Sequence, residues 1–341
     1  MKFQAWSRWM AVGVVGAMLT GCGIELYNNA GANRTLAPTD QYMRDAERYL
    51  EQGLDDSALA AFGLALETNP RLTEAHIGMG KIYLKYEDYK LASNAFERAT
   101  QSSPNSFEAH YYLGVARQMM GKLDLAIQSY LRAVTINPND FDANLNLASA
   151  YLVLNKPGDA LPYARRATQL RDDSAAAWAN LGAAYSLLGY DQHAVQAYRR
   201  VTELEDPAEQ VLLALADSHL KLGNYDLAAN VLESVVKRTP STLAYERLGY
   251  AYFKTHRYEK ALSNYDAALA IDPEHVAALN GRGVCLMTIY LQSRGSDPAQ
   301  RNAAIESWRQ SLKINPNQPR IVDLLSRYER LWTTRNIKEQ R

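Results

Sequence analysis

Two asparagines, Asn146 and Asn180, stand 34 residues apart in this chain of 341 residues and could hold a peptide backbone. An amide side chain carries both a hydrogen-bond donor and an acceptor, so a row of amides can pair with main-chain groups without reading their sequence. Apolar neighbours would supply affinity, while the amides fix the direction and register of the bound chain. The predicted peptide-binding residues are Tyr111, Val115, Leu145, Asn146, Ser149, Ala179, Asn180 and Ala183.

Two alternatives to this site remain open. The eight residues could simply pack between neighbouring helices. A partner could instead bind at Tyr250, Phe253 and Lys254, or at a set of arginines that recurs every 34 residues. Those arginines are Arg98, Arg132, Arg166 and Arg200, and on stacked helices they would form a stripe on the outer face. Such a stripe is either solvated or turned toward an acidic partner or a lipid headgroup.

Residues that could do covalent or metal chemistry are not grouped in recognisable motifs. The sequence has no phosphate-binding loop, no H-E-x-x-H, no G-x-S-x-G and no cysteine pair for zinc. His76 and His110 lie one repeat interval apart, and we interpret them as replacing an aromatic packing residue, with metal binding as the alternative. We therefore predict no enzyme activity, no cofactor, no bound metal and no small-molecule substrate.

The charge of the chain is balanced, with 37 basic and 37 acidic residues. A protein that binds nucleic acid through its phosphates would carry a basic surplus. The composition therefore argues against nucleic-acid binding.

An internal repeat sets the positions of these residues. Eight alanines recur at intervals of 34 residues, with one interval of 33 and a last one of 43: Ala58, Ala92, Ala126, Ala160, Ala194, Ala228, Ala261 and Ala304. A small residue lies twelve positions before most of them, and a bulky residue four after. Offsets of three and four place side chains on one face of a helix. A repeat of this length predicts stacked helical pairs rather than one globular core.

Turn-forming residues divide each repeat into two helices. Glycine, which adopts a left-handed conformation without steric cost, falls where the first helix must stop, at Gly53, Gly121, Gly189 and Gly223. Helix-starting residues open the next first helix, at Ser106, Asp140, Ser174 and Ser241. Nine extra residues between Leu291 and Asn302, with turn formers Gly295 to Pro298, predict a loop in the last repeat.

The pattern resembles the tetratricopeptide repeat. The segment from Ala177 to Tyr185, followed by Ala194 and Tyr198, matches the two helices of that motif, and several repeats end on its closing proline. The resemblance implies an all-α solenoid, a superhelix of about eight helix-turn-helix repeats over residues 39–318. An amphipathic helix over 319–335 would cap its open end. The pair of asparagines resembles the asparagine ladder in the repeats of the O-linked N-acetylglucosamine transferase, although only two rungs are present.

The N-terminus is predicted to contain a signal peptide and a cysteine that carries a membrane anchor. A basic start and a short apolar run over residues 1–21 are typical of a signal peptide. The segment Leu19-Thr20-Gly21-Cys22 resembles the bacterial lipobox, which implies a lipid on Cys22; an ordinary secretory signal with a chance cysteine is the alternative. Residues 22–38 would then be a lipidated cysteine and a flexible tether.

These features together predict a membrane-anchored binding scaffold in a bacterial envelope. Gly23 after the cysteine favours the outer membrane by resemblance to enterobacterial lipoproteins, with the solenoid facing the periplasm. The concave groove would hold another envelope protein or a peptide segment. Related lipoproteins assist pilus or secretin assembly or recruit peptidoglycan enzymes. An accessory subunit of a polysaccharide or protein-glycosylation machine is the alternative function.

Overall fold

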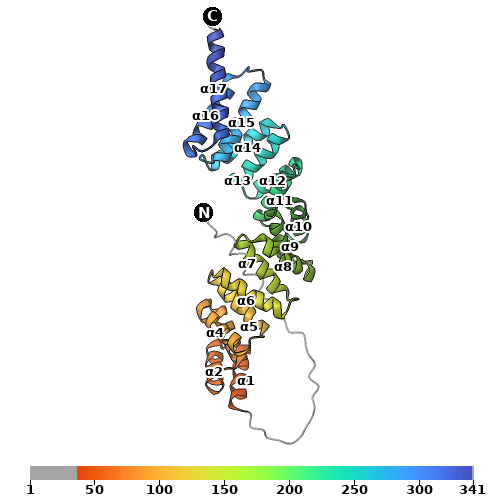
Figure 1. Ribbon diagram of the computed structural model, residues 1–341, viewed down its shortest axis with the longest axis vertical. Helices are drawn as coiled ribbons and strands as arrows, with labels where there is room; N and C mark the ends of the chain where they lie inside the picture. Colours follow the sequence, from red (N-terminus) through yellow and green to blue (C-terminus); the bar gives the residue numbers. More distant parts are fainter. Residues whose placement is uncertain (1–36, 340–341) are drawn as a thin grey trace.

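The computed structural model describes residues 37–339, and within that range it is built from helices without strands. The predicted signal peptide, Cys22 and nearly all of the tether lie outside the described residues. The helices follow one another along an extended stack (Figure 1). They are α1 Pro38–Glu51, α2 Asp55–Thr68, α3 Thr73–Lys85, α4 Tyr89–Ser102, α5 Phe107–Met119, α6 Leu123–Ile136, α7 Phe141–Val153, α8 Pro157–Leu170, α9 Ala175–Leu187, α10 Asp191–Leu204, α11 Glu209–Lys221, α12 Tyr225–Arg238, α13 Thr242–Lys254, α14 Tyr258–Ile271, α15 Val276–Gln292, α16 Pro298–Ile314 and α17 Pro319–Glu339.

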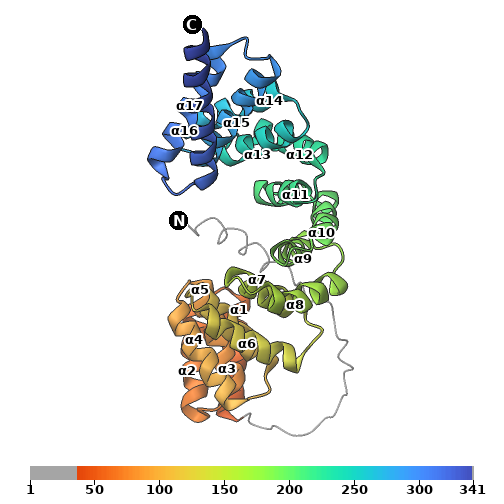
Figure 2. The ribbon, with the colours of Figure 1, turned by 45° about the horizontal axis from the view of Figure 1, so that its top comes forward.

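Odd-numbered helices from α1 to α15 are the first helices of the predicted repeats, and even-numbered helices are the second helices. The stack curves, so that its first and last repeats lie toward the same side (Figure 2). In the middle of the stack, α7, α9 and α11 line the concave side, and α8 and α10 lie on the convex side. The predicted all-α solenoid is confirmed.

The predicted helix boundaries follow from local chemistry. The side chains of Ser106, Asp140, Ser174 and Ser241 each accept a hydrogen bond from the main-chain N–H of an alanine three residues later. These contacts satisfy an N–H that the helix itself leaves unpaired. The four predicted glycines all have a positive φ, between 71° and 78°. Other repeats place Glu87, Asn155 and His256 in the same left-handed conformation.

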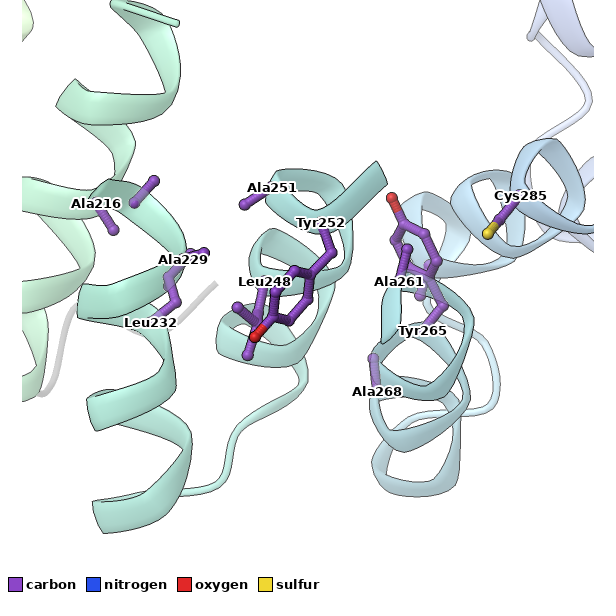
Figure 3. Packing of buried hydrophobic residues seen from close by; sticks show 12 residues of the cluster. Ala216, Ala229, Leu232, Leu248, Ala251, Tyr252, Ala261, Tyr265, Ala268 and Cys285 are labelled. Atoms are coloured by element: carbon purple, nitrogen blue, oxygen red, sulfur yellow. The ribbon is translucent and has the colours of Figure 1, made fainter. Parts of the chain in front are cut away.

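A bulky side chain from each of several second helices packs against a glycine of a first helix. A Cβ atom added at Gly80 would lie 2.6 Å from the Phe96 ring, and one added at Gly114 would lie 2.5 Å from the Tyr130 ring. Glycine is needed at these positions because the ring occupies the space of a side chain. Figure 3 shows the same arrangement near the C-terminal end, where the Tyr265 ring stands between α13 and α15.

The predicted loop in the last repeat is wrong. Four of the nine extra residues lengthen α15, three lengthen α16, and only two lengthen the turn between them. Asp297 caps α16 by accepting a hydrogen bond from the N–H of Ala299, and Pro298 occupies the first turn of that helix. These turn-forming residues therefore start a helix rather than extend a loop.

The last helix covers the end of the stack. Ile321 of α17 is buried in a cluster with Ile305 and Trp308 of α16, and the Tyr328 ring lies 6.1 Å from the Trp308 ring. A solenoid needs such a cover because its last repeat has no neighbour. None of the described helices is both long enough and apolar enough to span a bilayer.

Candidate functional site

The eight predicted peptide-binding residues lie on three consecutive first helices, α5, α7 and α9, on the concave side. Seven of them are half-buried, and Ser149 is buried. Helix α9 carries no charged residue, and Asp142 is the one charged residue of α7. The structure therefore brings the predicted residues together on one nearly uncharged surface.

Both asparagines are tied to the repeat before them. The Asn146 amide donates a hydrogen bond to the Tyr111 hydroxyl at 3.2 Å, and the Asn180 amide donates one to the Leu145 carbonyl at 3.3 Å. Each amide retains a second N–H and its carbonyl oxygen for other partners. The two side chains therefore bridge neighbouring first helices in addition to the role predicted for them, and that role stays a prediction.

An aromatic group borders this surface at its N-terminal end. The Tyr111 ring stacks on Phe107 at 5.9 Å and meets Tyr112 edge-on at 5.1 Å. Burial raises the pKa of Tyr111 far above its ordinary value, and the nearby Asp142 carboxylate raises it further. Tyr111 is therefore a neutral phenol that presents its ring and a hydrogen-bonding hydroxyl to the groove.

His76 and His110 occupy the same position in successive repeats. Such a set of equivalent positions is called a column below, and this column has a structural role. The Nε2 atom of each imidazole donates a hydrogen bond, at 3.0 Å, to the carbonyl oxygen of the proline six residues earlier. Asn144 and Trp178 make the same contact with Pro138 and Asp172. The column closes the turn between repeats. Among the side chains that the structure describes, in residues 37–329, no group of three or more His, Cys, Asp or Glu could hold a metal ion.

The repeating arginines lie on second helices, as the stripe requires. Arg98 and Arg132 are exposed, whereas Arg166 and Arg200 are half-buried. Arg166 bonds to Asn139 and Gln169, and Arg200 pairs with Glu203 at 2.9 Å. Part of the stripe is thus already paired with its own surface.

A charged group in the C-terminal half of the groove was not predicted. Asp217 of α11 pairs with Arg247 of α13 at 2.7 Å, and Glu246 of α13 lies beside them. Arg247 occupies the column of Asn146 and Asn180, so the column itself could have indicated the position. Its neighbours could not be inferred, because Asp217 belongs to another column and meets Arg247 only through the stacking of two repeats.

Hollows in the surface lie elsewhere. A shallow hollow of about 430 Å³ is lined by Glu259, Leu262, Ser263, Asp266, Ile289 and Gln300. These residues belong to α14, α15 and α16 and are far in sequence from the predicted groove. The concave surface is a better candidate for an extended partner, because it runs across three consecutive repeats, whereas the hollow is confined to α14, α15 and α16.

Stretches of the chain match family models described as tetratricopeptide repeat. One model matches residues 77–141, 213–275 and 246–289, a second matches 129–161, and a third matches 175–206. Together the matches cover more than half of the chain. No curated protein sequence matches it.

One solved structure shares the fold, and two further solved structures are similar to this chain with lower scores. The C-terminal part of a tetratricopeptide repeat-containing protein from Cytophaga hutchinsonii has a TM-score of 0.55 at 19% identity, covering 70% of this chain and 98% of that chain. PilF from Pseudomonas aeruginosa has a TM-score of 0.49 at 20% identity, covering 61% and 95%. A tetratricopeptide repeat protein from Parabacteroides merdae has a TM-score of 0.48 at 13% identity, covering 73% and 99%.

Proposed function

The chain belongs to the tetratricopeptide repeat family, whose solenoids are protein-interaction scaffolds, and we propose that it holds another envelope protein in its concave groove. The bound part would be an extended or helical segment lying across α5, α7 and α9. The scaffold would support the assembly of an envelope complex, of the kind formed around a pilus or secretin or in recruiting peptidoglycan enzymes.

One observation carries this proposal: eight uncharged residues of three consecutive first helices, two of them asparagines, form one surface, and α7 and α9 together carry a single charged residue. Apolar surface supplies affinity, and polar groups that remain available fix orientation. Charged groups border the surface, with Lys81 paired to Glu108 on one side and Arg247 paired to Asp217 on the other. The apolar part of a partner would therefore be centred on repeats three to five.

Replacing both asparagines by alanine tests the groove. The variant Asn146→Ala with Asn180→Ala should lower capture of the partner at least tenfold, about 1.4 kcal/mol for the pair. Capture is measured by crosslinking in cells and identification of the attached envelope protein. Loss of two hydrogen bonds between repeats should also lower the free energy of unfolding by about 1–3 kcal/mol in total.

A matched control separates binding from stability. Arg238→Ala removes the two hydrogen bonds that this side chain donates to Asp206 of the preceding repeat, away from the eight predicted residues, so it should weaken the fold modestly and leave capture nearly unchanged. A second control, Arg98→Ala with Arg132→Ala, changes the convex stripe. Undiminished capture by the folded asparagine variant would place the binding surface elsewhere, and loss with the arginine variant would place it on the convex side.

We further propose that a lipid on Cys22 anchors the scaffold, in the outer membrane and facing the periplasm. The support is the short apolar run that ends in Leu19-Thr20-Gly21-Cys22. Cys22→Ser should move the protein from the membrane fraction to the soluble fraction. Retention in membranes at high salt, with Met1 still present by mass spectrometry, would contradict the anchor.

A further inference from the structure

The C-terminal half of the concave surface contains a carboxylate without a partner. Glu246 of α13 is half-buried, and among the described residues no donor or cation lies within hydrogen-bonding or ion-pair distance of its side chain. Its neighbour Asp217, by contrast, pairs with Arg247 at 2.7 Å. Partial burial has removed some of the water around this carboxylate, and a ligand that donates hydrogen bonds would replace it.

A buried phenol points to the same place. The side chain of Tyr265 is 2% exposed, and no described residue hydrogen-bonds to its hydroxyl. The ring stands between α13 and α15 (Figure 3), and its hydroxyl oxygen lies 2.8 Å from a Cβ built at Gly281. Gly281 occupies the column of Asn146 and Asn180, so the hydroxyl reaches the level of the groove. Tyr130, the equivalent residue of the third repeat, uses its hydroxyl to donate to Gln118 at 2.9 Å.

An exposed aromatic ring completes the group. Tyr250 follows Glu246 by one helical turn on α13 and is 39% exposed. Glu246 shares one face of α13 with Gly249 and Tyr250, which follow it by three and four residues. A Cβ built at Gly249 would lie 3.0 Å from the Tyr265 ring, so the ring lies beside the face that carries Glu246. Burial is the main cause that raises the pKa of Tyr265, and the Glu246 carboxylate raises it further. Burial also raises the pKa of Glu246, with Arg247 and His275 opposing the shift and Asp217 adding to it.

The arginine and lysine side chains around Glu246 are already engaged, and the Nδ1 atom of His275 lies 3.8 Å from Asp272. Arg247 pairs with Asp217, and the Lys254 ammonium lies over the Tyr225 ring, 5.2 Å from its centroid. Lys221 lies 3.5 Å from Asp191. These contacts leave Glu246 as the carboxylate whose charge is not balanced by a direct partner.

We propose that Glu246, Tyr250 and Tyr265 form a subsite that binds a cationic side chain, arginine or lysine, of the protein held in the groove. The Glu246 carboxylate accepts hydrogen bonds from the cation, the Tyr265 hydroxyl offers its oxygen as a further acceptor, and the Tyr250 ring covers it. The subsite rests on the proposed function, because it places a basic residue of the partner C-terminal to the apolar surface of repeats three to five.

Pairs of synthetic peptides test the subsite. The probes are ten-residue leucine- and alanine-rich peptides that contain one arginine, together with identical peptides in which citrulline replaces it. Citrulline keeps the shape of arginine and removes its charge. A second pair compares lysine with acetyl-lysine, which tells whether a planar guanidinium is required. The full chain in detergent should bind the charged member of at least one pair about tenfold more tightly or better, as expected for a charge-assisted hydrogen bond.

Two variants locate the effect. Glu246→Gln should abolish the preference for the charged peptide without lowering the melting temperature, because it removes a charge that has no internal partner. Tyr265→Phe should reduce the preference about threefold and remain folded. The matched control is Glu274→Gln, an exposed carboxylate next to the start of α15, which should leave the preference unchanged.

The possible outcomes separate this subsite from the groove. Equal binding of charged and neutral peptides, absence of binding by all of them, or a preference that survives Glu246→Gln overturns the subsite. The variant Asn146→Ala with Asn180→Ala should weaken charged and neutral peptides by the same factor. If the charge preference depends on Glu246 while the asparagine variant binds normally, the subsite stands and the proposed groove at repeats three to five fails.

Discussion

Contacts between single rings and single glycines set the spacing between helices in this solenoid. A Cβ at Gly114 would overlap the Tyr130 ring, whereas a Cβ at Gly63, inside α2, would meet nothing within 4 Å. The same substitution should therefore have opposite effects at the two positions. At one glycine the ring needs the space, and at the other the helix gains from a residue with higher helix propensity.

Gly114→Ala should lower the free energy of unfolding by about 1–3 kcal/mol, the usual effect of overpacking a rigid core. Gly63→Ala should raise it by about 0.5–1 kcal/mol. Chemical denaturation of the two variants and the parent protein measures both changes. Equal effects of the two substitutions would show that the Tyr130 ring is not held against α5.

His219 makes the free energy of unfolding depend on pH. Its side chain is buried, and burial, helped by the nearby Arg199 charge, lowers its pKa from 6.5. The folded protein therefore prefers neutral imidazole, so the unfolded chain binds a proton first as the pH falls. The contribution is fully present above pH 6.5 and is lost as the pH falls from there toward the folded pKa.

His219→Tyr removes this contribution, because tyrosine is neutral throughout that range and occupies the same column at Tyr185 and Tyr252. The difference in unfolding free energy between the variant and the parent should shift in favour of the variant between pH 7.5 and pH 5. Comparing differences cancels the contributions of the other titratable groups, because the variant and the parent protein share them. A constant difference across the range would show that His219 binds a proton as readily in the folded protein as in the unfolded chain.

The helices of the last repeat show where a sequence pattern can mislead. Gly295, Ser296, Asp297 and Pro298 are turn formers, but aspartate and proline in that order also cap and start a helix. The nine extra residues could therefore lengthen a loop or lengthen helices. Packing decided between the two: Ile289 and Tyr290, at the end of α15, are partly buried against neighbouring clusters.

Shortening this repeat to the common length should consequently destabilise it. Replacing residues 289–300 by the three-residue turn Met120–Lys122 of the third repeat removes the contacts of Ile289 and Tyr290. The free energy of unfolding should fall by about 2 kcal/mol or more. Leu291→Ser, at a side chain that is 50% exposed, is the control and should change it by no more than about 0.5 kcal/mol. An unchanged melting temperature in the shortened protein would restore the loop interpretation.

For the whole molecule, the period of the sequence was enough to predict the architecture, because every repeat makes the same contacts with its neighbours. Caps at Ser106 and Asp140 and the left-handed Gly121 are local features and were predicted correctly. The contact of Asn180 with the Leu145 carbonyl was not predicted, because it depends on how far one repeat rotates against the next. The same holds for Asp217 and Arg247, which meet only across the gap between α11 and α13.

The flip rates of the tyrosine rings between first helices report how often neighbouring helices move apart. A tyrosine ring can flip by half a turn only when the atoms on both of its faces move aside, and a well-packed core resists that movement. Tyr265 is held by Gly249 on one side and Gly281 on the other. Its flip rate, seen as averaging of the two ring edges in an NMR spectrum, therefore counts how often α13 and α15 part. Tyr130 lies against Gly114 of α5, and Tyr198 lies against Gly182 of α9. The flip rates of these two rings therefore report helix separation near the groove of repeats three to five, so that the opening rate of the concave surface can be measured for each repeat separately.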